Sequence, residues 1–297
     1  MNLVAGATGL LGGEICRLLA ERGAPLRVLV RATSDKTKVE ALRASGAEIV
    51  LGDLKEPVAL VAACAGVEAV ISTVTSTTSR LDGDTIESVD RDGQLALVDA
   101  ARQAGVRRFV FVSFPEFKVE FPLQTAKRSV ERRIRESGLE YTVLRPTNFD
   151  EVWLTPRLGF DPLNGSVQVF GSGEQPVSWI SFRDVARLVV ESVDHPATRN
   201  AVIDLGGPEA LAYLEVVKVF EEVLGRPCEV AHVPVEALAA QKAAATDSLD
   251  ESFAGLLLGT AQEGQAIEMD SVLQLFPVEL TSVRDYAQAL VGAVQTS

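Results

Sequence analysis

The first half of the chain alternates short apolar runs with longer amphipathic segments, and this alternation constrains the fold more than any other feature. Apolar runs of strand length that are separated by helix-length segments predict parallel strands joined by crossover helices. The run FVFV at 109–112 is apolar throughout, as expected of a strand that is buried on both faces of a sheet. The pattern therefore predicts an α/β fold with a doubly wound parallel sheet.

The expected elements follow one another at short intervals up to residue 146. Strands rich in apolar and β-branched residues are predicted at 2–7, 26–31, 47–53, 68–74, 107–113 and 139–146. Helices are predicted between them at 10–23, 39–46, 57–66, 85–104 and 123–137. After a further helix at 181–193, parts of 165–207 are expected to return to the same sheet through strands at 167–170 and 201–205.

The remaining chain has a different character. Beyond Gly207, helix-length segments dominate, at 211–225, 235–245 and 283–294, whereas 246–280 is mixed and predicted to be rich in loops. We expect a nucleotide-binding domain at 1–150 and a smaller, mostly helical C-terminal lobe for a substrate or partner at 151–297.

The glycine-rich segment GATGLLG lies between the first expected strand and the first expected helix. Glycine allows a tight turn and a close approach of a pyrophosphate, and a helix N-terminus offers unpaired N–H groups. A glycine triplet alone is a weak signal, but this strand–loop–helix context favours a dinucleotide site over a merely structural turn. The expected contacts come from the loop itself: Gly6, Thr8, Gly9, Leu10, Leu11 and Gly12.

Arg31 is the last residue of the second expected strand, where a carboxylate would select the ribose 2′-hydroxyl of NAD. A cation suits a 2′-phosphate, so the sequence favours NADP(H) over NAD(H), with a solvated surface arginine as the alternative. Asp53 and Leu54 follow the third strand, where the adenine ring is expected. The ribose and nicotinamide are expected at the end of the fourth strand, beside Ser72, Thr73 and Val74.

Composition narrows the possible partners and locations. The formal net charge of −13 at pH 7 argues against a nucleic-acid partner and against adsorption to an anionic membrane. No apolar run approaches the ~20 residues of a membrane span, and the first residues do not resemble a signal peptide. Three scattered cysteines and two histidines indicate reduced thiols and no metal cluster. We therefore expect a cytoplasmic monomer or homodimer without membrane insertion.

Four motifs together resemble a known family: GATGLLG, Arg31, GDL at 52–54 and VDRDGQLALVDAA at 89–101. The chain resembles an atypical short-chain dehydrogenase/reductase of the NmrA-like and isoflavone-reductase-like kind, whose nucleotide-binding domain is a Rossmann fold. The likeness is strong to about residue 150 and looser afterwards. It implies that Ser113 and Lys127 occupy the catalytic serine and lysine positions. Leu123 stands where catalytic dehydrogenases carry a proton-donating tyrosine, which this branch often lacks.

Carbonyl reduction needs a hydride donor and a proton donor near the developing oxyanion, and leucine cannot donate a proton. Lys127 could hold the nicotinamide ribose, or donate the proton if desolvation lowers its pKa. Ser113 could donate a hydrogen bond to the substrate oxygen. Nearby aromatic residues indicate an apolar substrate pocket, with ordinary packing between lobes as the alternative. The candidates for this pocket are Phe114, Leu123, Phe149 and Trp153.

Two functions follow from these residues. The first is an NADP(H)-dependent oxidoreductase that reduces an apolar carbonyl, enone, imine or quinone, and Ser113, Lys127 and the aromatic residues favour it. The alternative is a non-catalytic NADP(H)-binding redox sensor, or an assembly or scaffold protein that binds a partner protein, and Leu123 favours it. The sequence leans to the enzyme.

Overall fold

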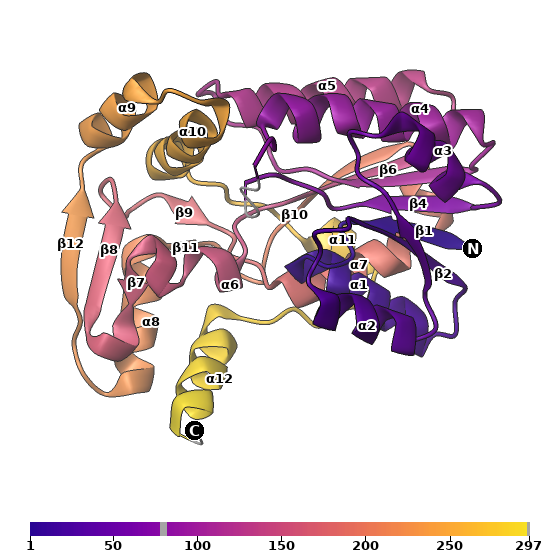
Figure 1. Cartoon of the computed structure of the whole chain (residues 1–297). Helices are drawn as coiled ribbons and strands as arrows, with labels where there is room; N and C mark the ends of the chain where they lie inside the picture. The colour runs from indigo at the N-terminus through magenta and orange to yellow at the C-terminus, as the bar shows by residue number, and fades with distance from the viewer. Residues whose placement is uncertain (78–81, 296–297) are drawn as a thin grey trace. The chain divides into compact units, whose positions relative to one another are not determined.

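The computed structural model describes residues 1–77 and 82–295, and the chain divides into two compact units (Figure 1). The first unit consists of Met1–Ser113, Pro122–Arg145 and Ala186–Ile203. The second unit consists of Phe114–Phe121, Pro146–Val185 and Asp204–Ser297. Each unit is therefore assembled from separate stretches of the sequence.

A seven-stranded sheet in the order β10-β6-β5-β4-β1-β2-β3 confirms the predicted doubly wound α/β fold. Its strands are β1 (Asn2–Ala5), β2 (Leu26–Val30), β3 (Glu48–Leu51), β4 (Ala69–Ser72), β5 (Arg108–Val112), β6 (Glu140–Pro146) and β10 (Ala201–Leu205). Strands β1 to β6 pair in parallel. The chain runs outward from β1 to β3 and then returns to β4 on the other side of β1. Ligands of such sheets bind at this switch point, beyond the carboxyl ends of the strands.

Helices cover both faces of this sheet, with α3, α4 and α5 on one face and α1 and α2 on the other (Figure 1). The helices are α1 (Leu10–Glu21), α2 (Lys36–Ala44), α3 (Pro57–Cys64), α4 (Gln94–Gln103), α5 (Pro122–Glu136) and α7 (Phe182–Ser192). Phe109 and Phe111 of β5 pack with Leu97 of α4 and Val130 of α5, while Val110 between them is equally buried. Apolar side chains on both faces of the strands thus explain why helices cover both faces of the sheet.

The predicted helix at 85–104 is not one regular α-helix. Its first part, η1 (Ile86–Gly93), is π-helical and is capped by reciprocal hydrogen bonds between Thr85 and Ser88. Gly93 packs so closely that an added Cβ would lie 2.7 Å from the Cβ of Leu54. Wide π-helical turns are rare and often occur at functional sites.

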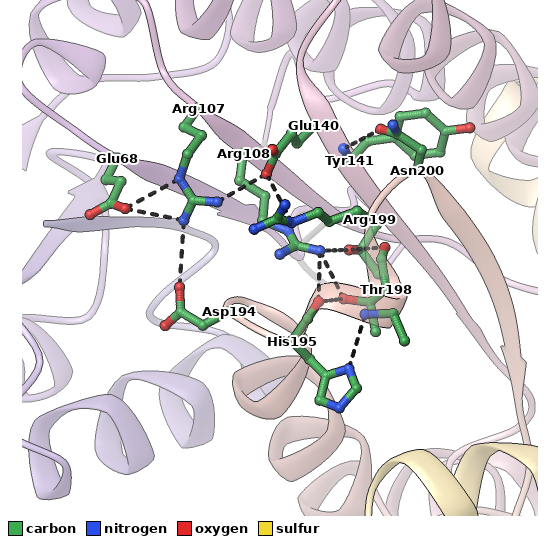
Figure 2. A network of polar contacts seen from close by, with 12 residues as sticks. Glu68, Arg107, Arg108, Glu140, Tyr141, Asp194, His195, Thr198, Arg199 and Asn200 are labelled. Atoms are coloured by element: carbon green, nitrogen blue, oxygen red, sulfur yellow. Dashed lines mark hydrogen bonds and ion pairs between the residues drawn. The ribbon is translucent and has the colours of Figure 1, made fainter.

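Two neighbouring arginines fix the amino end of β5 (Figure 2). Arg107 forms ion pairs with Glu68, Glu140 and Asp194. Arg108 is fully buried, and its Nη2 donates to the hydroxyls of Thr142 and Thr198 at 3.2 and 2.8 Å. Residues far along the sequence, in the short helix η4 (Pro196–Thr198) and its neighbourhood, are therefore part of the first unit.

The second unit contains small sheets of its own. Strands β7 (Phe160–Asp161), β8 (Ser166–Phe170) and β12 (Glu229–Val233) form a three-stranded sheet, and β9 (Pro176–Val177) pairs with β11 (Leu211–Ala212). Of the two strands predicted to return to the large sheet, β10 does so, but β8 was wrongly placed. It pairs in parallel with β12, a strand that the helical reading of the C-terminal region missed.

The remaining helices of the second unit are α6 (Asp150–Trp153), η2 (Pro156–Leu158), η3 (Pro162–Asn164), α8 (Tyr213–Leu224), α9 (Val235–Ala244), α10 (Ser248–Glu263), α11 (Asp270–Leu275) and α12 (Val283–Gln295). The prediction of a loop-rich 246–280 is wrong, because α10 has 16 residues. Gly255 and Gly259 are contact points where an added Cβ would meet the rings of Phe121 and Phe117 at 2.6 and 2.8 Å. None of the helices described is both long and apolar enough to cross a bilayer.

Candidate functional site

The glycine loop after β1 is as compact as its sequence predicts. Gly6 has a φ of 91°, and an added Cβ would lie 2.5 Å from the Thr73 hydroxyl oxygen. A Cβ on Gly12 would lie 2.2 Å from the carbonyl oxygen of Gly6. Gly9 begins α1 without a side-chain cap, and the first turn of α1 carries no acidic residue. The N–H groups of this turn and the positive end of the helix dipole suit an anion such as a pyrophosphate.

A lysine from α2 steadies the same loop. The Lys38 ammonium donates a hydrogen bond to the carbonyl oxygen of Thr8 at 3.0 Å. Asp35 caps α2 by accepting from the backbone N–H of Lys38 at 3.1 Å. Leu10 is exposed and Leu11 is buried, so only one of these two predicted contacts points away from the core.

Arg31 lies just beyond β2, as predicted, and its partly exposed side chain is ion-paired. Its Nη1 donates to the Asp84 carboxylate at 2.6 Å, and Lys55 donates to the other oxygen of the same carboxylate. The Asp84 side chain is only 1% exposed, whereas that of Arg31 is 31% exposed. Burial opposes ionisation of Asp84, but the hydrogen bonds from Lys55 and Arg31 outweigh it and hold its pKa below the ordinary value.

Asp53 and Leu54 follow β3 and face different surroundings. Asp53 accepts a hydrogen bond from the backbone N–H of Lys55 at 2.9 Å, and its carboxylate lies 3.6 Å from the Lys55 ammonium. Leu54 is buried against Gly93 of η1. Asp53 is therefore the more accessible of the two predicted adenine contacts.

The polar groups at the end of β4 hold the backbone in place. The Ser72 hydroxyl donates to the Gln94 side chain at 2.8 Å, and the Gln94 amide donates to the carbonyl oxygen of Val74 at 3.0 Å. The Thr73 hydroxyl donates to the carbonyl oxygen of Ala5 at 3.3 Å. Gln94, which the sequence did not single out, thus fixes the edge where the ribose and nicotinamide are expected.

Lys127 of α5 is buried between the carboxyl ends of β4 and β5. Its ammonium lies 3.4 Å from the carbonyl oxygens of Val74 and Val112 and 4.8 Å from the ring centroid of Phe111. The Asp90 carboxylate is 3.9 Å away. Burial lowers the pKa of Lys127 and Asp90 opposes this effect, so the pKa lies below the ordinary value of a lysine.

Asp90 is the main functional candidate that sequence reasoning missed. It is fully buried on η1, and one carboxylate oxygen accepts from both the N–H and the hydroxyl of Ser76, at 2.9 and 2.5 Å. The other oxygen, which is nearest to Lys127, has no hydrogen bond to any residue that the structure describes. A signal was present, because Asp90 occupies the apolar stripe that Ile86 and Leu97 define.

Ser113 ends β5 and lies beside a second buried carboxylate. Glu131 is held by Arg145 through two hydrogen bonds and by Arg128 at 2.6 Å. Burial opposes ionisation of Glu131, but Arg145 and the nearby Ser113 hydroxyl lower its pKa. The Ser113 oxygen itself is buried without a hydrogen bond of normal geometry to the described residues. Its hydroxyl is thus not committed to a firm internal partner.

The four predicted pocket residues lie in different units. Leu123 is a buried residue of α5 in the first unit. The other three lie in the second unit, where Phe114 stacks on Phe121 with ring centroids 5.9 Å apart. Phe149 and Trp153, at the two ends of α6, are half-buried. A shared pocket for these four residues remains a prediction.

Sequence comparison decides the family. A model of the NmrA-like family matches residues 2–287. The chain belongs to the NmrA-like family.

Within the described ranges 1–77 and 82–295, no group of three or more His, Cys, Asp or Glu is arranged to hold a metal ion.

Relatives of this NmrA-like protein include both enzymes and an assembly factor. An NAD(P)H azoreductase of Xenophilus azovorans is 32% identical over 80% of this chain and 78% of its own length. A photosystem II assembly factor of Trieres chinensis is 31% identical over 78% of this chain and 72% of its own length. An NADPH-dependent quinone oxidoreductase of Escherichia coli, solved with NADPH, shares the fold with a TM-score of 0.79 at 19% identity, covering 98% of this chain and 100% of its own.

Proposed function

We propose that the protein is an NADP(H)-dependent oxidoreductase that reduces an apolar carbonyl, enone, imine or quinone. The observation that carries the proposal is the buried Lys127, paired with Asp90 at the carboxyl ends of β4 and β5. A buried lysine beside a carboxylate in this position suits proton transfer, because burial lowers its pKa below the ordinary value of a lysine. The azoreductase among the relatives supports a reductase.

The proposed cofactor is NADP(H), in preference to NAD(H). The compact glycine loop supports a pyrophosphate at Gly6, Gly9 and Gly12, since an added Cβ at Gly6 or Gly12 would collide with neighbouring protein atoms and disturb the tight turn that presents the N–H groups. Arg31 would meet the 2′-phosphate, and Lys127 would also hydrogen-bond the nicotinamide ribose. Bound NADPH would supply a hydride to the substrate.

The residues of the chain would handle the proton. Lys127 in its ammonium form would donate a proton to the oxygen or nitrogen that gains charge as the hydride arrives. Asp90 would keep Lys127 protonated despite its burial, and Ser113 would orient the substrate by a hydrogen bond. Leu123 would line the apolar pocket with Phe114, Phe149 and Trp153 instead of donating a proton.

Steady-state rates with NADPH and a panel of quinones, enones, imines and aldehydes test this proposal. Lys127→Ala is expected to lower kcat by roughly 10²–10⁴-fold, and by far more than it weakens NADPH binding. Lys127→Arg should not restore the rate, because a guanidinium retains its proton at any relevant pH. Turnover that is indifferent to Lys127→Ala combined with Ser113→Ala would exclude the proposed roles.

A second candidate is a non-catalytic NADP(H)-binding sensor or assembly factor that binds a partner protein. Leu123 at the position of the usual proton donor favours this candidate, as does the relative named as a photosystem II assembly factor. NADPH binding without turnover of any substrate in the panel would support it. In either case we propose a cytoplasmic monomer or homodimer, which sedimentation and cell fractionation can check.

A further inference from the structure

A charge cluster beside the expected ribose site has no role in the proton chemistry. Arg31 and Lys55 both donate to Asp84, and Lys55 also lies 3.6 Å from Asp53. These two cations and two carboxylates have a combined charge of zero. Because the Asp84 side chain is 1% exposed, water screens its charge poorly. The arginine expected at a 2′-phosphate is therefore already neutralised.

This neutralisation affects the two nicotinamide nucleotides differently. A 2′-phosphate carries nearly two negative charges at pH 7, whereas the 2′-hydroxyl of NADH carries none. A phosphate that approached Arg31 would be attracted by the guanidinium and repelled by the Asp84 carboxylate 2.6 Å from it. A hydroxyl would experience little of either force. Asp84 thus opposes the selectivity that Arg31 provides.

We propose that Asp84 is a specificity-determining residue that narrows the preference for NADPH over NADH by neutralising Arg31 and Lys55. This rests on the proposed function, in which Arg31 faces the 2′-phosphate. Lys55 is then the second cation of the phosphate site. The chain accepts both nucleotides, and the charge of one buried carboxylate determines how strongly it distinguishes them.

Titration calorimetry with NADPH and NADH on the full-length protein tests the proposal. In the wild type, we expect NADPH to bind less than roughly tenfold more tightly than NADH. Asp84→Asn keeps the size of the side chain and removes its charge. It should therefore raise the ratio of the NADH Kd to the NADPH Kd by roughly tenfold, mainly through tighter NADPH binding. Lys55→Met should narrow the ratio, because the cluster then carries a net negative charge.

Asp82→Asn is the matched control. Asp82 is an exposed carboxylate two residues before Asp84, and its replacement changes the net charge of the protein by the same amount. The control should leave the ratio within about twofold of the wild type, because exposed charges are well screened.

Three results would overturn the proposal. A folded Asp84→Asn protein with an unchanged or smaller ratio would show that Asp84 only positions Arg31. If thermal unfolding shows that Asp84→Asn does not fold, the Lys55→Met variant tests the proposal instead. A ratio of NADH Kd to NADPH Kd that is unchanged in Lys55→Met would exclude the proposal. A wild-type protein that binds neither nucleotide would overturn the proposed function and this role together.

Discussion

At the scale of single residues, Lys127 and Asp90 are the pair on which the proposed proton transfer depends. A lysine buried alone would lose its proton easily, because desolvation disfavours the charged form. The Asp90 carboxylate at 3.9 Å counteracts this effect. Asp90 is held in turn by two hydrogen bonds from Ser76, so its position does not depend on Lys127. The carboxylate therefore controls how the lysine titrates.

Asp90→Asn should shift the pH dependence of the proposed reductase. Removing the carboxylate lowers the pKa of Lys127 further, so the acid form is lost at lower pH. Activity that falls as pH rises through this pKa should then fall earlier, and kcat should drop more at pH 8 than at pH 6. The pH profile of kcat measures this shift. A uniform loss at every pH would indicate a purely structural role.

Another buried acid, Asp150, is expected to affect stability. It is fully buried, and neither carboxylate oxygen has a hydrogen bond to a described residue. Burial, with smaller contributions from Glu151 and Asp184, raises its pKa well above the ordinary value. A raised folded-state pKa stabilises the protein below about pH 4, the ordinary carboxyl pKa, and this contribution is lost as pH rises through the folded-state pKa.

Asp150→Asn should therefore stabilise the protein at pH 8 and reduce the difference in stability between pH 5 and pH 8. We expect a gain of about 1–3 kcal/mol at pH 8, because an asparagine amide does not ionise and so lacks the pH-dependent cost of the buried carboxyl group. Urea unfolding at both pH values measures it. Glu209→Gln, at an exposed position, is the control. A loss of stability at pH 8 would contradict the assignment.

At the scale of elements, the turn between β1 and α1 depends on two glycines for different reasons. Gly6 adopts a positive φ of 91°, which few other residues tolerate. Gly12 has ordinary helical geometry but lies against the carbonyl oxygen of Gly6. The first is required by backbone conformation and the second by close packing of the helix on the loop.

Gly12→Ala should therefore impair both stability and NADPH binding, whereas Gly13→Ala should not. An added Cβ would lie 2.2 Å from the nearest backbone atom at Gly12 but 3.4 Å at Gly13. We expect Gly12→Ala to cost about 1–3 kcal/mol, because the loop must shift. Gly13→Ala should be neutral or stabilising by up to about 1 kcal/mol, because alanine favours helices. Urea unfolding and NADPH titration of both variants provide the measurement, and equal behaviour would contradict the packing argument.

At the scale of the whole molecule, the first unit is completed by a segment far along the sequence, Ala186–Ile203. Strand β10 extends the large sheet beside β6, and the Thr198 hydroxyl accepts a hydrogen bond from the buried Arg108 (Figure 2). Without this segment, Arg108 would lose the hydroxyl of Thr198 as a hydrogen-bond partner. The first unit is thus not contained within the first 150 residues.

A fragment of residues 1–150 should accordingly fail to fold cooperatively. It lacks β10, all of α7 and Thr198, one of the two threonines that accept from Arg108, so part of the sheet is uncovered and a buried guanidinium loses a partner. Thermal unfolding followed by circular dichroism should show a broad transition well below that of the full chain. A sharp transition within a few degrees of the full-length protein would disprove this dependence.

The sequence by itself determined the strand–glycine loop–helix unit, the six strands to residue 146 and the positions of Arg31, Ser113 and Lys127. These features are local, because hydrophobic period and backbone freedom are properties of neighbouring residues. Only the tertiary structure decided which distant residues and strands pair with one another. Asp84 is 53 residues from Arg31, and Asp90 reaches Lys127 only because η1 and α5 meet over the same sheet edge. The same holds for β8, which pairs with β12, and for the glycines of α10, which contact aromatic rings. Burial sets the strength of each charge pair, and burial exists only once distant segments have packed together.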